Sequence, residues 1–274
     1  MKIFISSDME GTAGVVDWDQ VVAGGHDYDY YADLLTKEVN AAIEGAMSVG
    51  ATEFLVNDSH SKMANLRPDA LSGSARYLSG RFKPMYMMQG LDATFDAVFF
   101  VSYHGSMSSK SSTLSHTYFP AAFAEVSING VVAGEAGINA LVALAYGVPV
   151  ILVTGDETTA REIEPFAPGV HAAVVKESVT RFAANSLHPR EACQLIFDKA
   201  ALATKSISAA KSVAIELPAT MSILFRTSDY ADLAARISGV VRTGDLSAEI
   251  VETDPLELYR AFITVVLLCR GLSD

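Results

Sequence analysis

The sequence predicts an α/β fold, in which a mostly parallel sheet is covered by helices and a smaller α+β unit follows at the C-terminal end. Segments of strand-like composition alternate with segments of helical spacing along most of the 274 residues. Several of the predicted strands are apolar without polar alternation, which is typical of parallel strands buried on both faces. Half of the residues are hydrophobic, which is enough to form a large core.

The first predicted elements are a strand, a helix and a second strand. Lys2–Ser7 is a short run of β-forming residues that ends before Gly11. A helix is expected from about 30 to 49, because its apolar residues recur three and four positions apart and Gly50 is suited to ending it. The sequence FLVN then predicts a strand that ends at residue 57.

The middle of the chain contains a mixed segment, an apolar strand and a hairpin. Residues 61–92 combine prolines with glycines, so we expect irregular structure there. The sequence AVFFVS at 97–102 predicts a strand, and the serine-rich residues 105–116 predict a loop. Asn129-Gly130 lies between two β-rich runs and is a preferred hairpin turn.

Helices and strands continue to alternate up to about residue 206. The expected elements are a helix at 135–146, strands at 150–154 and 170–175, and a helix at 189–206. The first of these helices should stop at Gly147, which readily takes the left-handed conformation of a helix end.

A domain boundary is expected between residues 207 and 208. The larger domain, 1–207, should carry the chemistry, and residues 208–274 should form a small α+β domain. The elements expected in it are a strand at 213–217, a helix at 228–239, a strand at 247–252 and a helix at 255–270. A unit of this size buries too little surface to be stable alone, so we expect it to pack on the first domain.

The acidic composition restricts the partners of the protein. The formal net charge is −12, which argues against nucleic acid or an anionic membrane as the main partner and leaves room for amino-bearing substrates and metal ions. The two cysteines, Cys193 and Cys269, form neither a zinc pattern nor a disulfide framework. The N-terminal apolar run is too short for a signal peptide, so we expect a cytoplasmic location.

Three predicted strands end in side chains of the types that bind metals. Asp8 and Glu10 follow the first strand, His60 the second and His104 the third. Because ligands bind beyond the carboxyl ends of the strands in open α/β sheets, these side chains would converge if the strands are neighbours. Carboxylates together with imidazoles suit zinc or a similar divalent ion. Taken singly, each residue is more often a cap, a turn former or a structural histidine, so the prediction depends on the group.

Two further residues have both a functional and an ordinary structural interpretation. Glu135 lies among glycines at a predicted helix start, where an acid also interacts favourably with the helix dipole. His116 lies in a polar loop and is either a catalytic acid or base or an ordinary surface histidine. Taken alone, the surface interpretation of His116 is favoured.

Together these residues resemble the zinc-dependent D-aminopeptidase family, peptidase family M55. The motifs that carry the resemblance are Ser6-x-Asp8-x-Glu10-Gly11, Asn57-Asp58-Ser59-His60, His104, His116-Thr117, Gly134-Glu135 and Gly155-Asp156-Glu157. They occur in order over about the first 190 residues, whereas the C-terminal part offers no motif. The combination is specific, although each motif by itself is weak.

The resemblance implies a site for two zinc ions in each subunit. Asp8 would bridge both ions, Glu10 and Glu135 would complete one of them, and His60 and His104 would complete the other. Such a pair of ions lowers the pKa of a shared water and polarises the scissile carbonyl.

The resemblance also implies an activity and an assembly. The family removes an N-terminal D-residue, typically D-Ala, from short peptides or amides. His116 would lie outside the coordination shell and act either in proton transfer or in stabilising the tetrahedral intermediate. The family forms ring-like homo-oligomers that enclose the site in a channel, and a decamer is the candidate size.

Two other classes of function remain open at this stage. Another two-metal hydrolase, an amidohydrolase or a phosphoesterase, would use the same ligand types, although the sequence shows no Lys/Arg cluster near them. A non-enzymatic metal- or peptide-binding protein would keep the five ligands and have no use for His116.

Glu10 and four more charged side chains receive provisional interpretations. Glu10 or Asp58 is expected to contact the amine of the substrate. Asp156 either supports the site or caps a helix. Lys176 is expected to be solvated rather than to neutralise a substrate carboxylate, and the same holds for Arg181.

Overall fold

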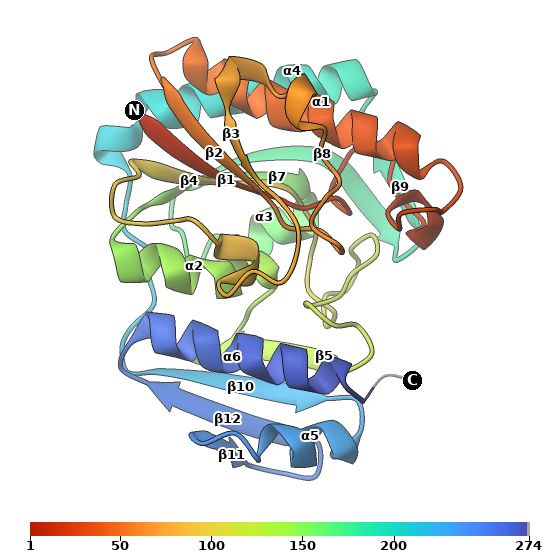
Figure 1. Cartoon of the computed structure of the whole chain (residues 1–274), viewed down its shortest axis with the longest axis vertical. Helices are drawn as coiled ribbons and strands as arrows, with labels where there is room; N and C mark the ends of the chain where they lie inside the picture. Colours follow the sequence, from red (N-terminus) through yellow and green to blue (C-terminus); the bar gives the residue numbers. More distant parts are fainter. Residues whose placement is uncertain (273–274) are drawn as a thin grey trace.

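The larger of two sheets has seven strands in the order β3-β2-β1-β4-β7-β8-β9 (Figure 1). The computed structural model describes residues 1–272. The strands of this sheet are β1 (Lys2–Ser7), β2 (Glu53–Asp58), β3 (Arg76–Leu78), β4 (Ala97–Tyr103), β7 (Val150–Asp156), β8 (His171–Thr180) and β9 (Ala183–Ser186). All neighbouring strands in it are parallel except β8 and β9, so the predicted mostly parallel sheet is confirmed.

Helices cover both faces of this sheet. The pair α1 (Tyr28–Met47) and α4 (Pro189–Lys205) lies on one face, and α2 (Glu135–Tyr146) with α3 (Glu157–Ile163) lies on the other (Figure 1). The middle of β1 is apolar on both faces, because Ile3 and Ile5 pack beneath the first pair while Phe4 packs on the opposite side. Within residues 1–272, no helix is long and apolar enough to cross a membrane.

The smaller sheet is antiparallel and has the order β11-β12-β10-β5-β6. Its strands are β5 (Phe123–Ile128), β6 (Val131–Val132), β10 (Ala219–Phe225), β11 (Val240–Arg242) and β12 (Ser247–Glu252), accompanied by α5 (Ser228–Ala234) and α6 (Pro255–Arg270). Helix α6 lies between α2 and this sheet (Figure 1). Ile138 of α2, Phe262 of α6 and Met221 of β10 belong to one hydrophobic cluster, so the two layers share a core.

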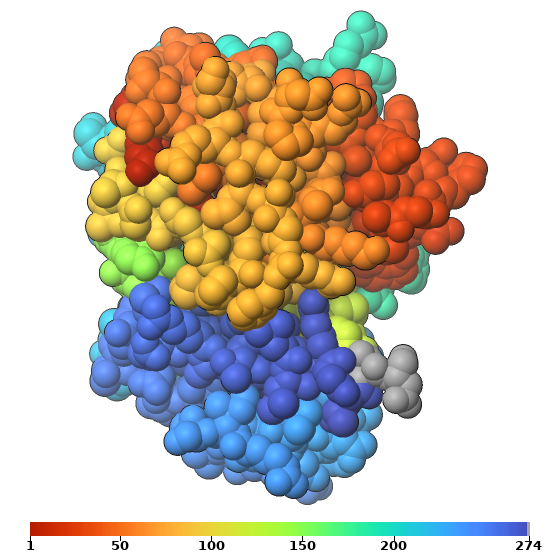
Figure 2. Space-filling view, viewed as in Figure 1, coloured from red at the N-terminus to blue at the C-terminus, as the bar shows by residue number. Residues whose placement is uncertain are grey.

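The C-terminal segment is not a self-contained unit. Its sheet includes the hairpin β5–β6, which comes from the middle of the chain and pairs with β10. In Figure 2 the C-terminal segment, in blue, packs directly against the segment of residues 61–92, in orange. The division into domains at residues 207 and 208 stays a prediction, and the shared hairpin and core make the two parts interdependent.

Several predicted elements have the bounds that the sequence suggested, among them β1, α2, β12 and α6. The prediction of a strand at 213–217 is wrong, because this segment is irregular and strand β10 begins only at Ala219. Val213 and Ile215 are nevertheless buried in the core, which explains the apolar pattern that suggested a strand. Pro218 has no N–H to donate to a ladder, so the strand starts after it.

Candidate metal centre

The metal-type side chains meet at one edge of the larger sheet. β1 pairs in parallel with β2 on one side and with β4 on the other, so the three carboxyl ends lie together. Asp8 and Glu10 follow β1, and the loop that carries them rests on β4 at Gly11. A Cβ at Gly11 would lie 2.1 Å from the carbonyl oxygen of Tyr103, so only glycine permits this approach. Glu135 reaches the same place from the first turn of α2.

Five predicted ligands form two groups that share Asp8. In the first group, His60 Nδ1 lies 3.4 Å from Asp8 Oδ1 and 2.9 Å from Glu10 Oε2. In the second, His104 Nε2 lies 3.4 Å from Asp8 Oδ2 and 3.9 Å from Glu135 Oε1. The ligand atoms of each group lie within 4.8 Å of one another. The distances therefore join Glu10 to His60 and Glu135 to His104, which differs from the pairing that the family resemblance implied.

The cluster has the properties of a site built for a cation. Asp8, Glu10, His104 and Glu135 are each at most 3% exposed, so the solvent does not screen their charges. Among the described residues, Asp8 Oδ2, Glu10 Oε2 and His104 Nε2 are buried without a hydrogen-bond partner. Burying such atoms unpaired is costly, and a divalent ion would satisfy all three. The donor set of carboxylates and imidazoles therefore fits zinc.

Two backbone carbonyls orient the histidines of the cluster. His60 Nε2 lies 2.6 Å from the carbonyl oxygen of Val21, and His104 Nδ1 lies 2.9 Å from that of Gly105. Because a carbonyl oxygen only accepts, these ring nitrogens donate, and they carry the single proton when the ring is neutral, as a metal ligand must be. The other nitrogen of each ring then turns its lone pair toward the carboxylates, which is the arrangement of a metal-ligating histidine.

The charges of the cluster are strongly coupled. Burial raises the pKa of Glu135 to about 8, and the nearby Asp8 carboxylate adds to this effect. Burial lowers the pKa of His104, but the attraction of Glu135 and Asp8 outweighs it and raises the value to about 9. Burial also opposes ionisation of Glu10, yet His60 and the other histidines hold the pKa of Glu10 well below its usual range. The carboxylates therefore stabilise positive charge next to them, and a bound dication would supply such a charge.

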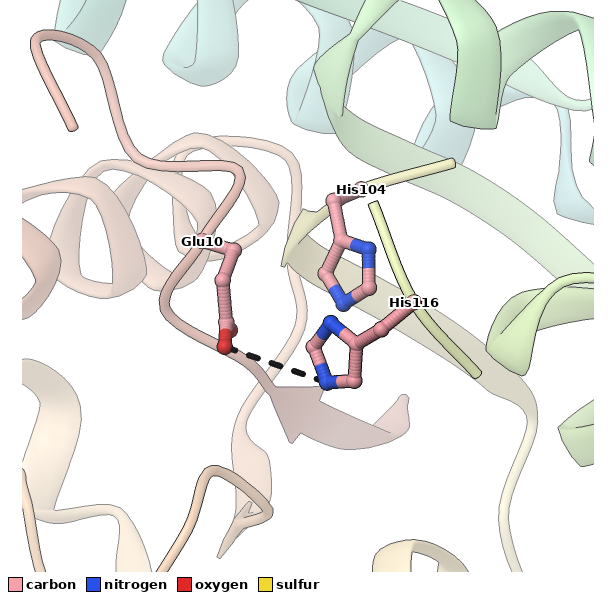
Figure 3. Close-up of side chains that lie close together, drawn as sticks. All are labelled: Glu10, His104 and His116. Atoms are coloured by element: carbon pink, nitrogen blue, oxygen red, sulfur yellow. Dashed lines mark ion pairs between the residues drawn. The ribbon is translucent and has the colours of Figure 1, made fainter. Parts of the chain in front are cut away.

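His116 lies at this site rather than on the open surface. Its ring stacks on that of His104 with centroids 4.3 Å apart, and its Nε2 faces Glu10 Oε1 at 4.0 Å (Figure 3). The same nitrogen lies 3.5 Å from Glu135 Oε1. Its Nδ1 donates to the carbonyl oxygen of Leu114 at 2.9 Å, so Nε2 has no proton in the neutral ring. Burial lowers the pKa of His116 to about 3, and the charge of the neighbouring His104 contributes to this shift as the second-largest cause. The ring is therefore neutral and presents a proton acceptor to the cluster.

A small cavity of about 160 Å³ opens over the cluster. It is lined by Asp8, Glu10, His60, His116 and Glu135, and its other walls include Trp18, Tyr86, Tyr118 and Arg270. Sequence reasoning missed Tyr86, Tyr118 and Arg270, because they come from distant loops and from α6. The cavity is thus a hollow with acids and imidazoles at its base and aromatic side chains around it.

The structure corrects two of the provisional interpretations and decides a third. Asp58 is fully buried and accepts hydrogen bonds from Asn65, Leu66 and Tyr77, so it does not meet a substrate amine. Lys176 is 1% exposed, so the expectation that it is solvated is wrong. Asp156 has both roles: its Oδ1 accepts from the backbone N–H of Thr159 and caps α3, and its Oδ2 accepts from Ser112 Oγ, which itself accepts from the N–H of Gly105 beside His104.

Lys176 instead holds the loop that carries Glu10. Its Nζ donates to the carbonyl oxygens of Glu10, Thr12 and Val15. From the other side Glu38 of α1 accepts from the N–H of Ala13 at 2.8 Å and from Ser102 Oγ at 2.7 Å. We call Lys176 and Glu38 the loop clamp, because together they fix the backbone between residues 10 and 15.

Fold and site together are those of a metal-dependent hydrolase, with ligands at the carboxyl edge of a sheet and a neutral histidine beside them. The family model of the D-aminopeptidases, peptidase family M55, matches residues 1–264. The chain therefore belongs to this family, as its motifs indicated.

A curated relative and a solved structure are similar to this chain over their full length. The D-aminopeptidase of Bacillus subtilis (strain 168) is 36% identical over 274 residues, which are 100% of this chain and 99% of that relative. The solved structure of the zinc-dependent D-aminopeptidase DppA from Bacillus subtilis, described as a self-compartmentalizing protease, matches with a TM-score of 0.94 at 35% identity and covers 100% of both chains. The predicted enzyme class, a zinc-dependent metallo-aminopeptidase, is confirmed.

The loop clamp leads to a prediction about metal binding. Lys176→Met removes three hydrogen bonds to buried carbonyls and should lower the free energy of unfolding by about 2–4 kcal/mol. Because the loop then loses its fixed backbone, zinc should also bind at least tenfold more weakly, measured by calorimetric titration of the metal-free protein. The matched control is Lys211→Met, which changes an exposed lysine and should leave both quantities near wild type. Wild-type zinc affinity in Lys176→Met would contradict the role of the clamp.

Proposed function

We propose that this protein is a two-zinc aminopeptidase that removes an N-terminal D-residue of the D-Ala type from short peptides or amides. The observation that carries the proposal is the buried cluster, in which Asp8 is shared by two groups of ligands and three polar atoms lack a partner. Full-length similarity to a zinc-dependent D-aminopeptidase supports the substrate class. The small cavity over the cluster is suited to a short substrate.

We assign the ligands of the two ions from the distances in the cluster. Asp8 would contact both ions, with Glu10 and His60 on one and with His104 and Glu135 on the other. When bound, zinc would polarise the scissile carbonyl and lower the pKa of the attacking water. The carbonyls of Val21 and Gly105 keep the two imidazoles in the orientation that this ligation needs.

His116 is proposed to move the proton in the reaction. Its Nε2 lacks a proton in the neutral ring and faces the cluster, while the bond from Nδ1 to Leu114 fixes the ring. The imidazole can therefore accept a proton at Nε2 from the attacking water as the water begins to bond to the scissile carbonyl. It can then donate this proton to the leaving amine. Of the two roles that the family resemblance implied, this geometry supports proton transfer.

The amine of the substrate would be held by acid at the base of the cavity. Glu10 is the candidate, because its side chain lines the cavity and its Oε1 is not the oxygen that faces His60. An ammonium group carries the opposite charge and would lie beside it. A phosphoesterase, by contrast, needs several cations around its substrate, and Arg270 is the only Arg or Lys among the described residues that line the cavity.

The proposed role of His116 predicts a loss of turnover without a loss of metal. His116→Ala should lower kcat by about 10²–10⁴-fold, because the reaction loses its proton carrier. Zinc content, measured by elemental analysis, should stay at the wild-type value. The matched control is His26→Ala, whose side chain is 84% exposed and which should retain full activity. Loss of zinc from His116→Ala would instead identify His116 as a ligand within the group that it forms with Glu10 and His104.

The proposed substrate class predicts a stereochemical preference that depends on zinc. The wild-type protein should hydrolyse D-Ala-D-Ala and D-alanine amide, and it should turn over the L-isomers at least a hundredfold less well. A chelator should abolish the activity, and added zinc should restore it. The measurement is a steady-state comparison of the four compounds. Equal or better turnover of the L-isomers would overturn the D assignment, and activity that resists chelation would overturn the metal mechanism.

We further propose that the protein acts in the cytoplasm as a ring-like homo-oligomer, with ten subunits as the candidate size. The support is the full-length match to a self-compartmentalizing protease. Light scattering should therefore give a mass that is a high multiple of the 29.2 kDa subunit. A mass equal to one subunit would contradict the assembly and leave the proposed chemistry unaffected.

A further inference from the structure

We infer that Glu162 strengthens zinc binding at His104, because its negative charge acts on that imidazole through the peptide group between Gly105 and Ser106. The carbonyl oxygen of this peptide accepts from His104 Nδ1 at 2.9 Å, and its N–H donates to Glu162 Oε2 at 2.8 Å. Glu162 is thus a positioning residue that acts through a ligand. The inference rests on the proposed function, since it takes His104 as a ligand of one of the two ions.

The two hydrogen bonds of this peptide group act in the same direction. In a trans peptide the C=O and the N–H point to opposite sides, so His104 and Glu162 flank the group. A carboxylate that accepts from the N–H leaves the carbonyl oxygen more negative, because hydrogen bonds in a chain polarise one another. That oxygen then attracts the proton on His104 Nδ1 more strongly, which makes Nε2 a better electron donor to a metal.

Glu162 reaches this peptide because two glycines leave room for it. A Cβ at Gly134 would lie 2.9 Å from Glu162 Oε2. A Cβ at Gly105 would collide with Cγ2 of Thr158. Thr158 and Glu162 are one turn apart, so they lie on the same face of α3. This face therefore approaches both the loop after β4 and the start of α2, and each of these segments carries a proposed ligand.

The position of Glu162 is unfavourable for a carboxylate in the metal-free protein. It lies in the last turn of α3, where the helix dipole favours cations. Burial raises the pKa of Glu162, while the two hydrogen bonds from Ser106 oppose this shift by stabilising the ionised form. The charge therefore costs stability when no metal is bound, and a dication at the cluster would offset that cost.

His60 provides a comparison within the same site. Its Nε2 donates to the carbonyl of Val21, and the N–H of that peptide, which belongs to Val22, donates to the backbone carbonyl of Trp18 at 3.1 Å. A neutral carbonyl polarises a peptide less than a carboxylate does. The ion at His104 should therefore respond to the charge of Glu162, and the ion at His60 should not.

A purely structural role for Glu162 is the alternative, because its bonds also hold Ser106 in place. Glu162→Gln separates the two roles. The amide has the same shape, its oxygen still accepts from the N–H of Ser106, and its NH2 group can donate to Ser106 Oγ. This variant therefore loses the charge and keeps both hydrogen bonds.

In Glu162→Gln one of the two zinc ions should bind about 10- to 100-fold more weakly, and the other should keep its wild-type affinity. The measurement is calorimetric titration of the metal-free protein with zinc. The thermal midpoint of metal-free Glu162→Gln should equal or exceed that of the wild type, because a buried charge has been removed. Glu162→Ala also removes the acceptors and should lower both quantities.

The matched control is Glu164→Gln, which removes an exposed carboxylate two residues further along the chain. It makes the same change in net charge and should leave zinc affinity and thermal midpoint at the wild-type values. A double variant tests the route through the imidazole. In the His104→Ala background, Glu162→Gln should change the affinity for the remaining zinc by less than about twofold, because the residue that transmits the charge is absent.

The outcomes separate this inference from the proposed function. Wild-type affinity for both ions in Glu162→Gln would overturn the role of Glu162, and so would an undiminished effect of this change in the His104→Ala background. A lowered thermal midpoint of metal-free Glu162→Gln would replace the inferred role by a structural one. Metal-free wild-type protein that takes up no zinc would overturn the proposed function itself.

Discussion

The structure depends on one constraint, namely that three carboxylates are buried within a few ångströms of one another. Asp8, Glu10 and Glu135 repel each other and are cut off from water, so they are tolerable only with positive charge between them. Histidines supply part of that charge and leave polar atoms unpaired. A bound divalent cation would satisfy those atoms, so the cluster has the properties of a metal centre.

Such a cluster needs a rigid frame, because mutually repelling groups move apart unless the backbone holds them. The frame is itself made of buried charges. Lys176 and Glu38 hold the loop after β1 from opposite sides, and almost all of their bonds go to backbone groups. A buried lysine is costly, and burial lowers the pKa of Lys176 to about 8. That cost is offset by three carbonyl acceptors and by nearby carboxylates, so the fold gains a fixed position for Glu10.

The sequence predicted the parts of the site that follow from topology. Asp8, His60 and His104 follow parallel strands, and such strands bring their carboxyl ends together whatever else the chain does. It could not predict the loop clamp, because Lys176 lies 166 residues from Glu10 and binds carbonyls that every residue possesses. The prediction of a strand at 213–217 was wrong, because a buried irregular segment can have the same apolar pattern as a strand.

The antiparallel sheet has a larger part in the site than its lack of motifs suggests. Its strand β6 leads directly into Gly134 and the start of α2, so the hairpin that pairs with β10 also fixes where Glu135 enters the cluster. Helix α6 packs between this sheet and α2, and its last turn carries Arg270 to the cavity. The backbone of Tyr118 joins the two side chains. One layer therefore positions both Glu135 and Arg270 at the cavity, so a shift of that layer would move both side chains together.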